Sequence, residues 1–204
     1  LIGTLDAQFR GRRFGGRRRG DPMKFDRSEY PTWEASAPFA SDGFTFVRIK
    51  TSPSRNRTSN RDWTADYPDA DLYFSWRLHQ LTSMKVNPDP LVLELTDSRL
   101  ADYPFVFLAA PQSVDFTSAE VAALRSYLLQ GGFMMCDEFF GTVQWDLFHR
   151  QLKRVFPEFE PRELDLSHEL FHNVYDFDFL PQVTLYPREI ILEDPGVLGG
   201  GRER

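Results

Sequence analysis

Short apolar runs and helical stripes alternate along the middle of the chain, between residues 44 and 166. Residues 44–50 alternate in polarity and are rich in β-branched and aromatic side chains, which predicts the first strand. Apolar residues recur at helical spacing over residues 68–84 and 143–156, so two helices are predicted there. Asp69 or Asp71 is the expected N-cap of the first of these helices. The remaining runs, 91–95 and 105–109, are predicted strands, and 161–166 is predicted to be a strand or an extended segment.

The stretch from Thr117 to Gly141 predicts a further helix followed directly by a strand. Thr117 and Glu120 have capping-box spacing, so each can bond the other's backbone N–H at a helix start. Gly131 and Gly132 allow the left-handed residue that ends a helix. Phe133–Cys136 is short and wholly apolar, which is typical of a strand buried on both faces.

Strands that alternate with helices predict an α/β domain with a mostly parallel sheet and helices on both faces. The length of 204 residues suits one such domain. We expect residues 1–40 to be a disordered leader rich in Arg and Gly, 41–185 to form the domain, and 186–204 to be an irregular tail.

Charge is distributed unevenly along the chain. Residues 1–24 hold seven Lys or Arg and two Asp, a net charge of +5, whereas the whole chain carries −6, which leaves −11 for the remainder. An acidic body is a poor general binder of nucleic acid. An RNA-binding role would depend on the Arg-Gly leader, and a solvated leader is the alternative.

Three observations concern the compartment. The chain begins with Leu1, and residues 1–7 have the character of the end of a signal peptide, which predicts a periplasmic or secreted protein. No apolar run approaches the ~20 residues of a membrane span. The single cysteine, Cys136, excludes an internal disulfide.

Asp137 and Glu138 are the first candidate site residues. They follow the apolar run 133–136, and ligands of open α/β sheets bind outside the carboxyl ends of the strands. The alternative is that both acids cap the next turn or helix.

The second candidate site is the sequence His168-Glu169-Leu170-Phe171-His172. In an α-helix, HExxH places two imidazoles on one face to bind zinc, with the Glu as general base. Ser167 is the expected N-cap of a helix that begins directly at the motif. In metalloproteases the HExxH motif lies inside a long helix. The alternative is a surface helical turn.

Cys136 is the only thiol available as a nucleophile. A nucleophile elbow needs small residues two positions before and after the nucleophile, and Met134 and Glu138 occupy those positions. A buried structural thiol is therefore predicted.

The order of several segments resembles an uncharacterised bacterial family, the domain of unknown function DUF4159. The segments are residues 63–90, 91–108, 131–141 (GGFMMCDEFFG), 145–157 (WDLFHRQLKRVFP) and 164–172 (LDLSHELFH). The resemblance implies a flavodoxin-like, class I glutamine amidotransferase-like three-layer sandwich, with an acid at Glu138 and histidines at His168 and His172. Relatives continue with more strands, so this chain looks C-terminally truncated.

Together these features predict an envelope-associated ligand- or protein-binding module without glutaminase activity and without a cofactor. Its expected partner is a protein of a cell-envelope complex, and nucleic acid is not expected. The alternative is a metal-dependent hydrolase in which His168 and His172 bind zinc and Asp137, Glu138 or Glu169 acts in catalysis.

Overall fold

The structure, a computed structural model, describes residues 24–34, 43–52, 62–173 and 175–179. They form an α/β fold with four parallel strands and three α-helices, as the alternating pattern predicts. In chain order the elements are β1 (Val47–Ile49), α1 (Asp69–Leu81), β2 (Leu91–Leu93), β3 (Phe105–Ala109), α2 (Ser118–Leu129), β4 (Phe133–Asp137) and α3 (Gly141–Val155). Short 3₁₀ turns lie at Arg27–Glu29, Ser98–Asp102, Pro111–Ser113 and Glu169–His172.

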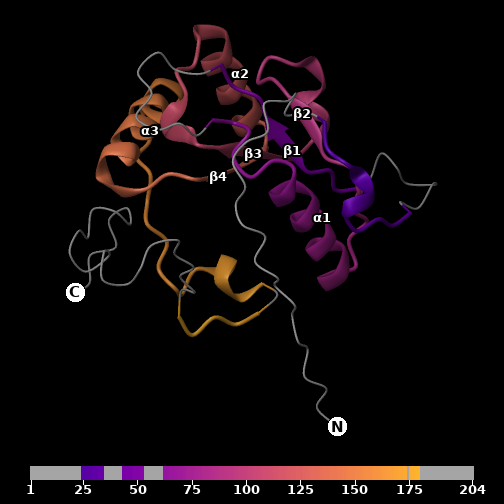
Figure 1. The fold of residues 1–204 in the computed structure, drawn as a ribbon. Helices are drawn as coiled ribbons and strands as arrows, with labels where there is room; N and C mark the ends of the chain where they lie inside the picture. The colour runs from indigo at the N-terminus through magenta and orange to yellow at the C-terminus, as the bar shows by residue number, and fades with distance from the viewer. Residues whose placement is uncertain (1–23, 35–42, 53–61, 174, 180–204) are drawn as a thin grey trace.

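The strands are ordered β2-β1-β3-β4 (Figure 1). Val47 pairs with Leu91 on one side of β1, and Arg48 pairs with Phe107 on the other. β3 and β4 pair along their whole length, from Phe105–Phe133 to Ala109–Asp137. Because all four strands are parallel, their carboxyl ends meet at one edge of the sheet.

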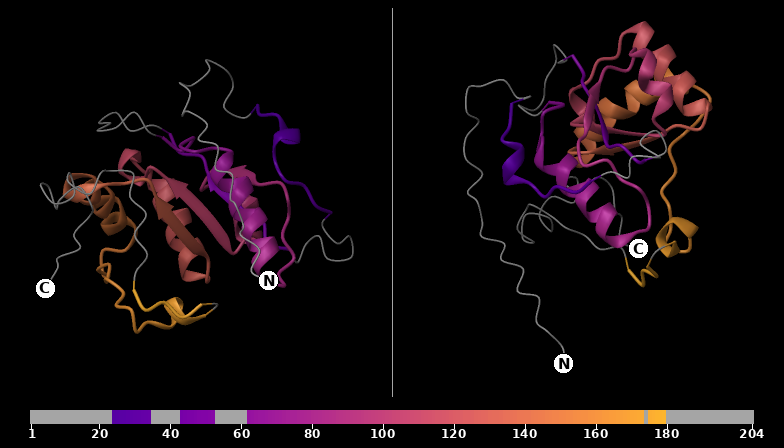
Figure 2. Two further views of the ribbon diagram at one scale, coloured as in Figure 1. Left: turned by 60° about the horizontal axis from the view of Figure 1, so that its bottom comes forward. Right: turned by 90° about the vertical axis from the view of Figure 1, so that its right-hand side faces the viewer.

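Helices pack on both faces of the sheet (Figure 2). On one face the larger core joins β1, β2 and β3 to α2 and α3, and includes Val47, Leu108, Leu124 and Phe148. On the other face, α1 contributes Phe74, whose ring lies 5.3 Å from that of Phe46. Because side chains alternate between the two faces of each strand, the strands contribute residues to two separate hydrophobic layers.

The helix and strand predicted within residues 117–141 are confirmed as α2 and β4. Thr117 Oγ1 accepts from the Glu120 backbone N–H at 3.2 Å, and the Glu120 carboxylate accepts from the Thr117 N–H at 2.7 Å. Gly131 ends α2 with φ of 97°. A Cβ on Gly132 would meet the Tyr127 ring at 2.4 Å, so only glycine fits this close approach.

The prediction that residues 133–136 are buried on both faces is wrong. Met134 and Cys136 pack against the α2–α3 core, but Phe133 is 57% exposed and Met135 is 37% exposed. The reason is that α1 covers β1 and β3 on that face, and no described helix extends over β4. An apolar run this short does not reveal whether one or both faces are covered.

A buried ion pair joins β1 to the first turn of α1. Arg48 Nε donates to Asp71 Oδ1 at 2.9 Å, and both side chains are fully buried. Arg48 Nη1 also donates to the carbonyls of Trp63 and Ala65. The predicted capping of α1 by Asp69 or Asp71 is wrong. Pro68 occupies the N-cap position, and no side chain of the described residues caps the helix. Asp71 instead binds Arg48, and Asp69 accepts a hydrogen bond from the Tyr30 hydroxyl.

Residues 24–34 pack on the outer side of α1. Trp33 stacks on His79 with ring centroids 4.9 Å apart, and its indole N–H donates to the Val86 carbonyl. Arg27 Nε donates to Asp89 at 2.8 Å. Among the described residues, no helix is both long and apolar enough to cross a lipid bilayer.

Replacing Arg48 with Met should lower the free energy of unfolding by about 3–5 kcal/mol, because Asp71 would remain buried without its counter-charge. Urea denaturation followed by circular dichroism measures the change. Lys50→Met is the matched control, since the Lys50–Glu94 pair is more than half exposed and should contribute less than about 1 kcal/mol. Equal effects of the two substitutions would contradict this role for Arg48.

Candidate ligand site at the carboxyl ends of the strands

Two neighbouring strands end in left-handed residues that are not glycine. Ala110 follows β3 with φ of 50°, and Glu138 follows β4 with φ of 72°. The Ala110 N–H donates to the Asp137 carbonyl at 3.0 Å, so the two bends are adjacent. A left-handed conformation costs a non-glycine residue about 1–2 kcal/mol. Such strain is concentrated at functional sites, where the surrounding structure maintains it.

Gln112 lies in the turn that follows Ala110. Its side chain is only 3% exposed, and neither its amide nitrogen nor its amide oxygen has a hydrogen-bond partner in the described part of the chain. Buried amides are nearly always paired, and an unpaired polar group costs about 1–3 kcal/mol. The turn Pro111–Ser113 packs against α3 and is buried throughout. The site therefore holds a polar group that no described residue satisfies.

The two predicted acids lie at this corner but have different surroundings. Asp137 is exposed and its carboxylate accepts from the Glu138 backbone N–H at 2.7 Å. The Glu138 side chain is only 8% exposed. Glu138 occupies the strand-to-helix bend between β4 and α3, which is where a nucleophile elbow presents its reactive residue.

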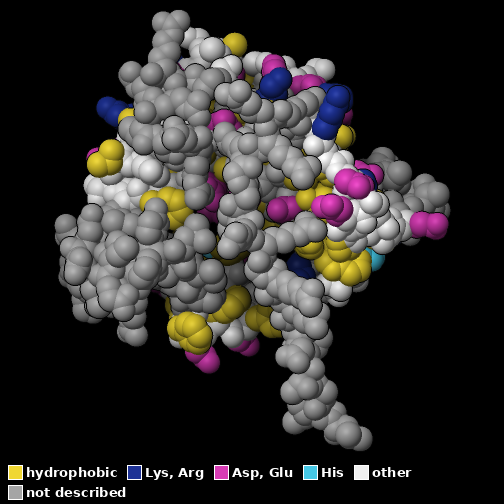
Figure 3. Space-filling model, viewed as in Figure 1, with side chains coloured by type: hydrophobic (Ala, Val, Ile, Leu, Met, Phe, Trp, Pro, Cys, Tyr) yellow, Lys and Arg dark blue, Asp and Glu magenta, His cyan; other side chains and the backbone are white. Residues whose placement is uncertain are grey.

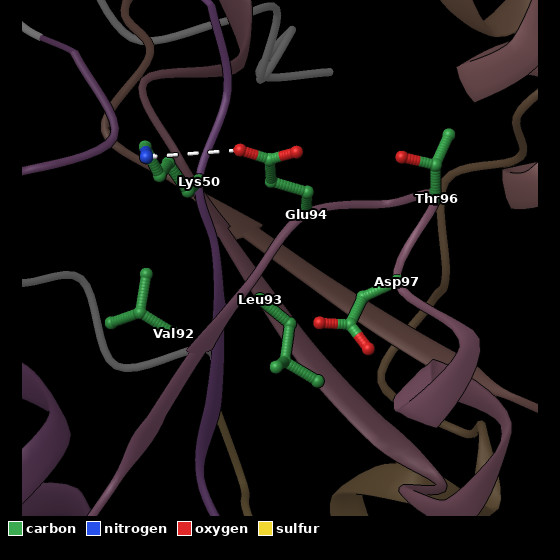
Figure 4. A pocket seen from close by; sticks show the side chains of 6 residues that line it. All are labelled: Lys50, Val92, Leu93, Glu94, Thr96 and Asp97. Carbon is green, nitrogen blue, oxygen red and sulfur yellow. Dashed lines mark ion pairs between the residues drawn. The ribbon is translucent and has the colours of Figure 1, made fainter.

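A pocket of about 320 Å³ lies at the same edge of the sheet, at the ends of β1 and β2 (Figure 4). Lys50 Nζ and Glu94 Oε1 are 3.7 Å apart on its rim. Asp97 contributes a further carboxylate, and hydrogen bonds from the Arg99 side chain and the Arg99 backbone N–H lower its pKa to about 2. The pocket is thus lined by fixed charges of both signs.

Cys136 does not take part in this corner. Its side chain packs with the α2–α3 core, opposite to the exposed face of β4. Burial raises the pKa of the thiol to about 12, with a smaller contribution from Asp137. The thiol is therefore protonated at neutral pH and unsuited to nucleophilic attack.

The HELFH sequence forms a 3₁₀ turn of four residues, Glu169–His172, rather than an α-helix. His168 is its N-cap and accepts from the Leu170 N–H through Nδ1, so the cap lies one residue after the predicted Ser167. His172 has both ring nitrogens engaged, with Asp176 at 3.1 Å and the Leu166 carbonyl at 2.8 Å. These contacts raise the pKa of His172, which disfavours the neutral form that a metal requires.

The segment around this turn lies beyond the α/β core, in the lower part of Figure 1. Hydrophobic side chains are exposed there (Figure 3), among them Leu170 and Phe179 at 53% and 72%. The segment 161–166 contains no strand. No three His, Cys, Asp or Glu side chains of the described residues are grouped closely enough to hold a metal ion.

The sequence pattern places the two acids at this edge of the sheet but gives no sign of Ala110, Gln112 or Lys50. Pro111-Gln112-Ser113 reads as an ordinary turn, and nothing in the sequence marks a left-handed alanine. Only the position of the turn, directly after a predicted strand of a parallel sheet, could have drawn attention to it.

Replacing Gln112 with Met should raise the free energy of unfolding by about 1–2 kcal/mol, because an apolar side chain of similar shape removes an unsatisfied buried amide. Urea denaturation measures the change. The control is Gln80→Met on the exposed side of α1, which should stay within about 0.5 kcal/mol of the wild type. A loss of stability on replacing Gln112 would show that its amide is satisfied in the folded protein.

Alkylation of Cys136 by iodoacetamide at pH 8 should be about a thousandfold slower in the folded protein than in 8 M urea, because only the thiolate reacts. Cys136 is the only cysteine, so mass spectrometry of the intact protein follows the reaction directly. Similar rates in both conditions would mean that the thiol is accessible and ionised.

Comparison with known families identifies the family of this chain. The family model described as Domain of unknown function (DUF4159) matches residues 45–195, from before β1 to beyond the last described residue. A search of curated proteins found no match. Because the family model covers well over half of the chain, the protein belongs to the DUF4159 family.

Proposed function

We propose that this domain is a binding module that takes a small polar ligand at the carboxyl edge of its sheet, without thiol chemistry. The observation that carries the proposal is the corner formed by Ala110, Gln112 and Glu138. Two adjacent strands end there in strained residues, beside a buried amide that has no partner among the described residues.

The strain and the unsatisfied amide have the same energetic consequence. Each lowers the stability of the free protein by an amount comparable with a whole hydrogen bond. A ligand that hydrogen-bonds to this corner would recover part of that free energy, whereas a purely structural corner would gain nothing from keeping Gln112 polar. A cost to stability of this kind is typical of binding sites.

The chemistry of the edge indicates the class of ligand. Asp137 and Glu138 supply acceptors, Gln112 supplies a donor and an acceptor, and Lys50 adds a positive charge at the end of β1. A ligand that carries both N–H donors and an anionic group, such as an amino acid or a related zwitterion, matches this set. The pocket that Lys50 lines at the ends of β1 and β2 has a volume of about 320 Å³, which is at the small end of ligand pockets.

The strand order supports a flavodoxin-like arrangement within the class I glutamine amidotransferase-like group. The order β2-β1-β3-β4 is the first part of the flavodoxin order 2-1-3-4-5, in which ligands bind at the switch between the first and third strands. Lys50 and Ala110 lie on the two sides of that switch. Glutaminase chemistry is not part of the proposal, because Cys136 is buried and lies two residues before the bend.

The alternative, a zinc hydrolase using His168 and His172, has no supporting geometry in the described ranges. The 3₁₀ turn does not place the two imidazoles as an α-helix would. A cell-envelope location stays a prediction, which no described residue tests.

A thermal-shift screen with the twenty amino acids, γ-aminobutyrate, betaine, succinate and putrescine, each at 10 mM, tests the proposal. A zwitterion present at 100 times its Kd should stabilise the protein by about 2.7 kcal/mol, a rise in Tm of about 5–10 °C. Calorimetric titration of the best compound should then give at least a tenfold weaker Kd for Glu138→Gln and for Gln112→Met.

Glu160→Gln is the matched control, because Glu160 is an exposed acid paired with Lys153 and His149, outside the strand-end corner. It should bind the compound as the wild type does. A screen in which no compound raises Tm, or equal losses in Glu138→Gln and Glu160→Gln, would contradict the proposal.

A further inference from the structure

Every non-glycine residue with a positive φ in the described ranges lies in a loop that follows a strand. These residues are Asp66, Ala110 and Glu138, with φ of 53°, 50° and 72°. Asp66 belongs to the loop between β1 and α1, and the other two follow β3 and β4. Because β1, β3 and β4 are neighbours in the sheet, the three left-handed residues follow adjacent strands. Backbone strain of this kind is concentrated at functional sites.

The loop before α1 reaches the carboxyl edge of the sheet, because α1 runs antiparallel to β1. Asp71 in the first turn of the helix binds Arg48. One turn further along α1, the Phe74 ring lies 5.3 Å from that of Phe46, which precedes Arg48 in the chain. The residues before Asp71 therefore lie beyond Arg48, toward the carboxyl end of β1.

A shared buried cluster connects Asp66 to the strand-end corner. Ala65, directly before Asp66, and Ala109, directly before Ala110, belong to the same small hydrophobic cluster and are 8% and 0% exposed. The Ala65 carbonyl also accepts from Arg48 Nη1 at 2.9 Å, which fixes the position of the loop against β1. Asp66 and Ala110 thus follow two residues of one cluster, and Asp66 lies beside the proposed ligand site.

The backbone of Asp66 is fixed, whereas its carboxylate is available. The Asp66 carbonyl accepts from the Ala70 N–H at 2.9 Å at the start of α1. The Asp66 side chain is exposed, and it has no hydrogen bond or ion pair with any other described residue. Other carboxylates at this edge are engaged: Glu94 with Lys50, Asp97 with Arg99, and Asp137 with the Glu138 N–H. An acceptor held on a rigid backbone loses little conformational entropy when it binds.

We infer that Asp66 binds the ammonium group of the ligand and thereby selects zwitterions over simple carboxylic acids. The inference rests on the proposed function, which brings the ligand to the neighbouring corner. A carboxylate and an ammonium group form charge-assisted hydrogen bonds, which are about twice as strong as neutral ones. The Gln112 amide is an independent reason to expect a polar ligand here, because it is 3% exposed and has no partner among the described residues. Lys50, at the end of β1, is the cation available to the ligand carboxylate.

The test compares the wild type with Asp66→Asn on two probes. Asn tolerates the left-handed conformation as Asp does, so the substitution removes the charge and keeps the backbone. The first probe is the amino acid that raises the Tm of the wild type most in the thermal-shift screen. The second is the carboxylic acid with the same carbon chain and no amino group.

Calorimetric titration should give an amino acid Kd at least tenfold weaker for Asp66→Asn than for the wild type. The wild type should bind the deaminated acid at least tenfold more weakly than the amino acid. Asp66→Asn should bind the deaminated acid within about twofold of the wild type, because that probe lacks the group that Asp66 contacts.

Asp102→Asn is the matched control, because Asp102 is an exposed acid in the turn before β3, at the opposite edge of the sheet. It should bind both probes as the wild type does, and circular dichroism should show that both variants are folded. Equal binding of the amino acid by Asp66→Asn and the wild type, or equal losses for both probes in Asp66→Asn, would overturn this inference alone. A screen in which no amino acid raises the Tm of the wild type would overturn the proposed function and the inference with it.

Discussion

The ion pair between Arg48 and Asp71 is the interaction on which the rest of the described fold depends. It places a guanidinium in the middle of a parallel sheet, under a helix, where no water reaches it. The free-energy gain from such a pair is small, because desolvation offsets most of the Coulomb attraction. The pair ties the first turn of α1 to β1, and Arg48 also donates to the carbonyls of Trp63 and Ala65, so one guanidinium joins three segments.

That placement determines which part of the sheet is covered. With α1 fixed over β1 and β3, no helix of the described residues covers Phe133 and Met135 on β4. The strained residues Ala110 and Glu138 lie at the carboxyl ends of β3 and β4. The exposure of the β4 face thus follows from where α1 is anchored.

Sequence patterns predicted the elements well where local chemistry decides the structure. Thr117 and Glu120 bond as the capping box requires, and β3 has the predicted bounds, because both features depend on residues close together in the chain. Features that depend on distant partners were not predictable. The partner of Arg48 is 23 residues away, and the exposure of Met135 depends on where α1 lies. The HELFH pattern has the residue types of a zinc motif, yet Asp165 binds Ser167 and starts a turn there.

The same reasoning explains why the acids were found and Gln112 was not. Acidic residues after an apolar run are visible in a sequence, because the position of a strand end follows from the pattern. An unsatisfied amide is a property of the packed structure, since it depends on which groups surround the side chain. Gln112 is buried by the contact of its turn with α3, and that contact exists only because β3 and β4 are neighbours. A polar side chain held there without a partner among the described residues reduces stability, and the proposed binding at that corner would offset the loss.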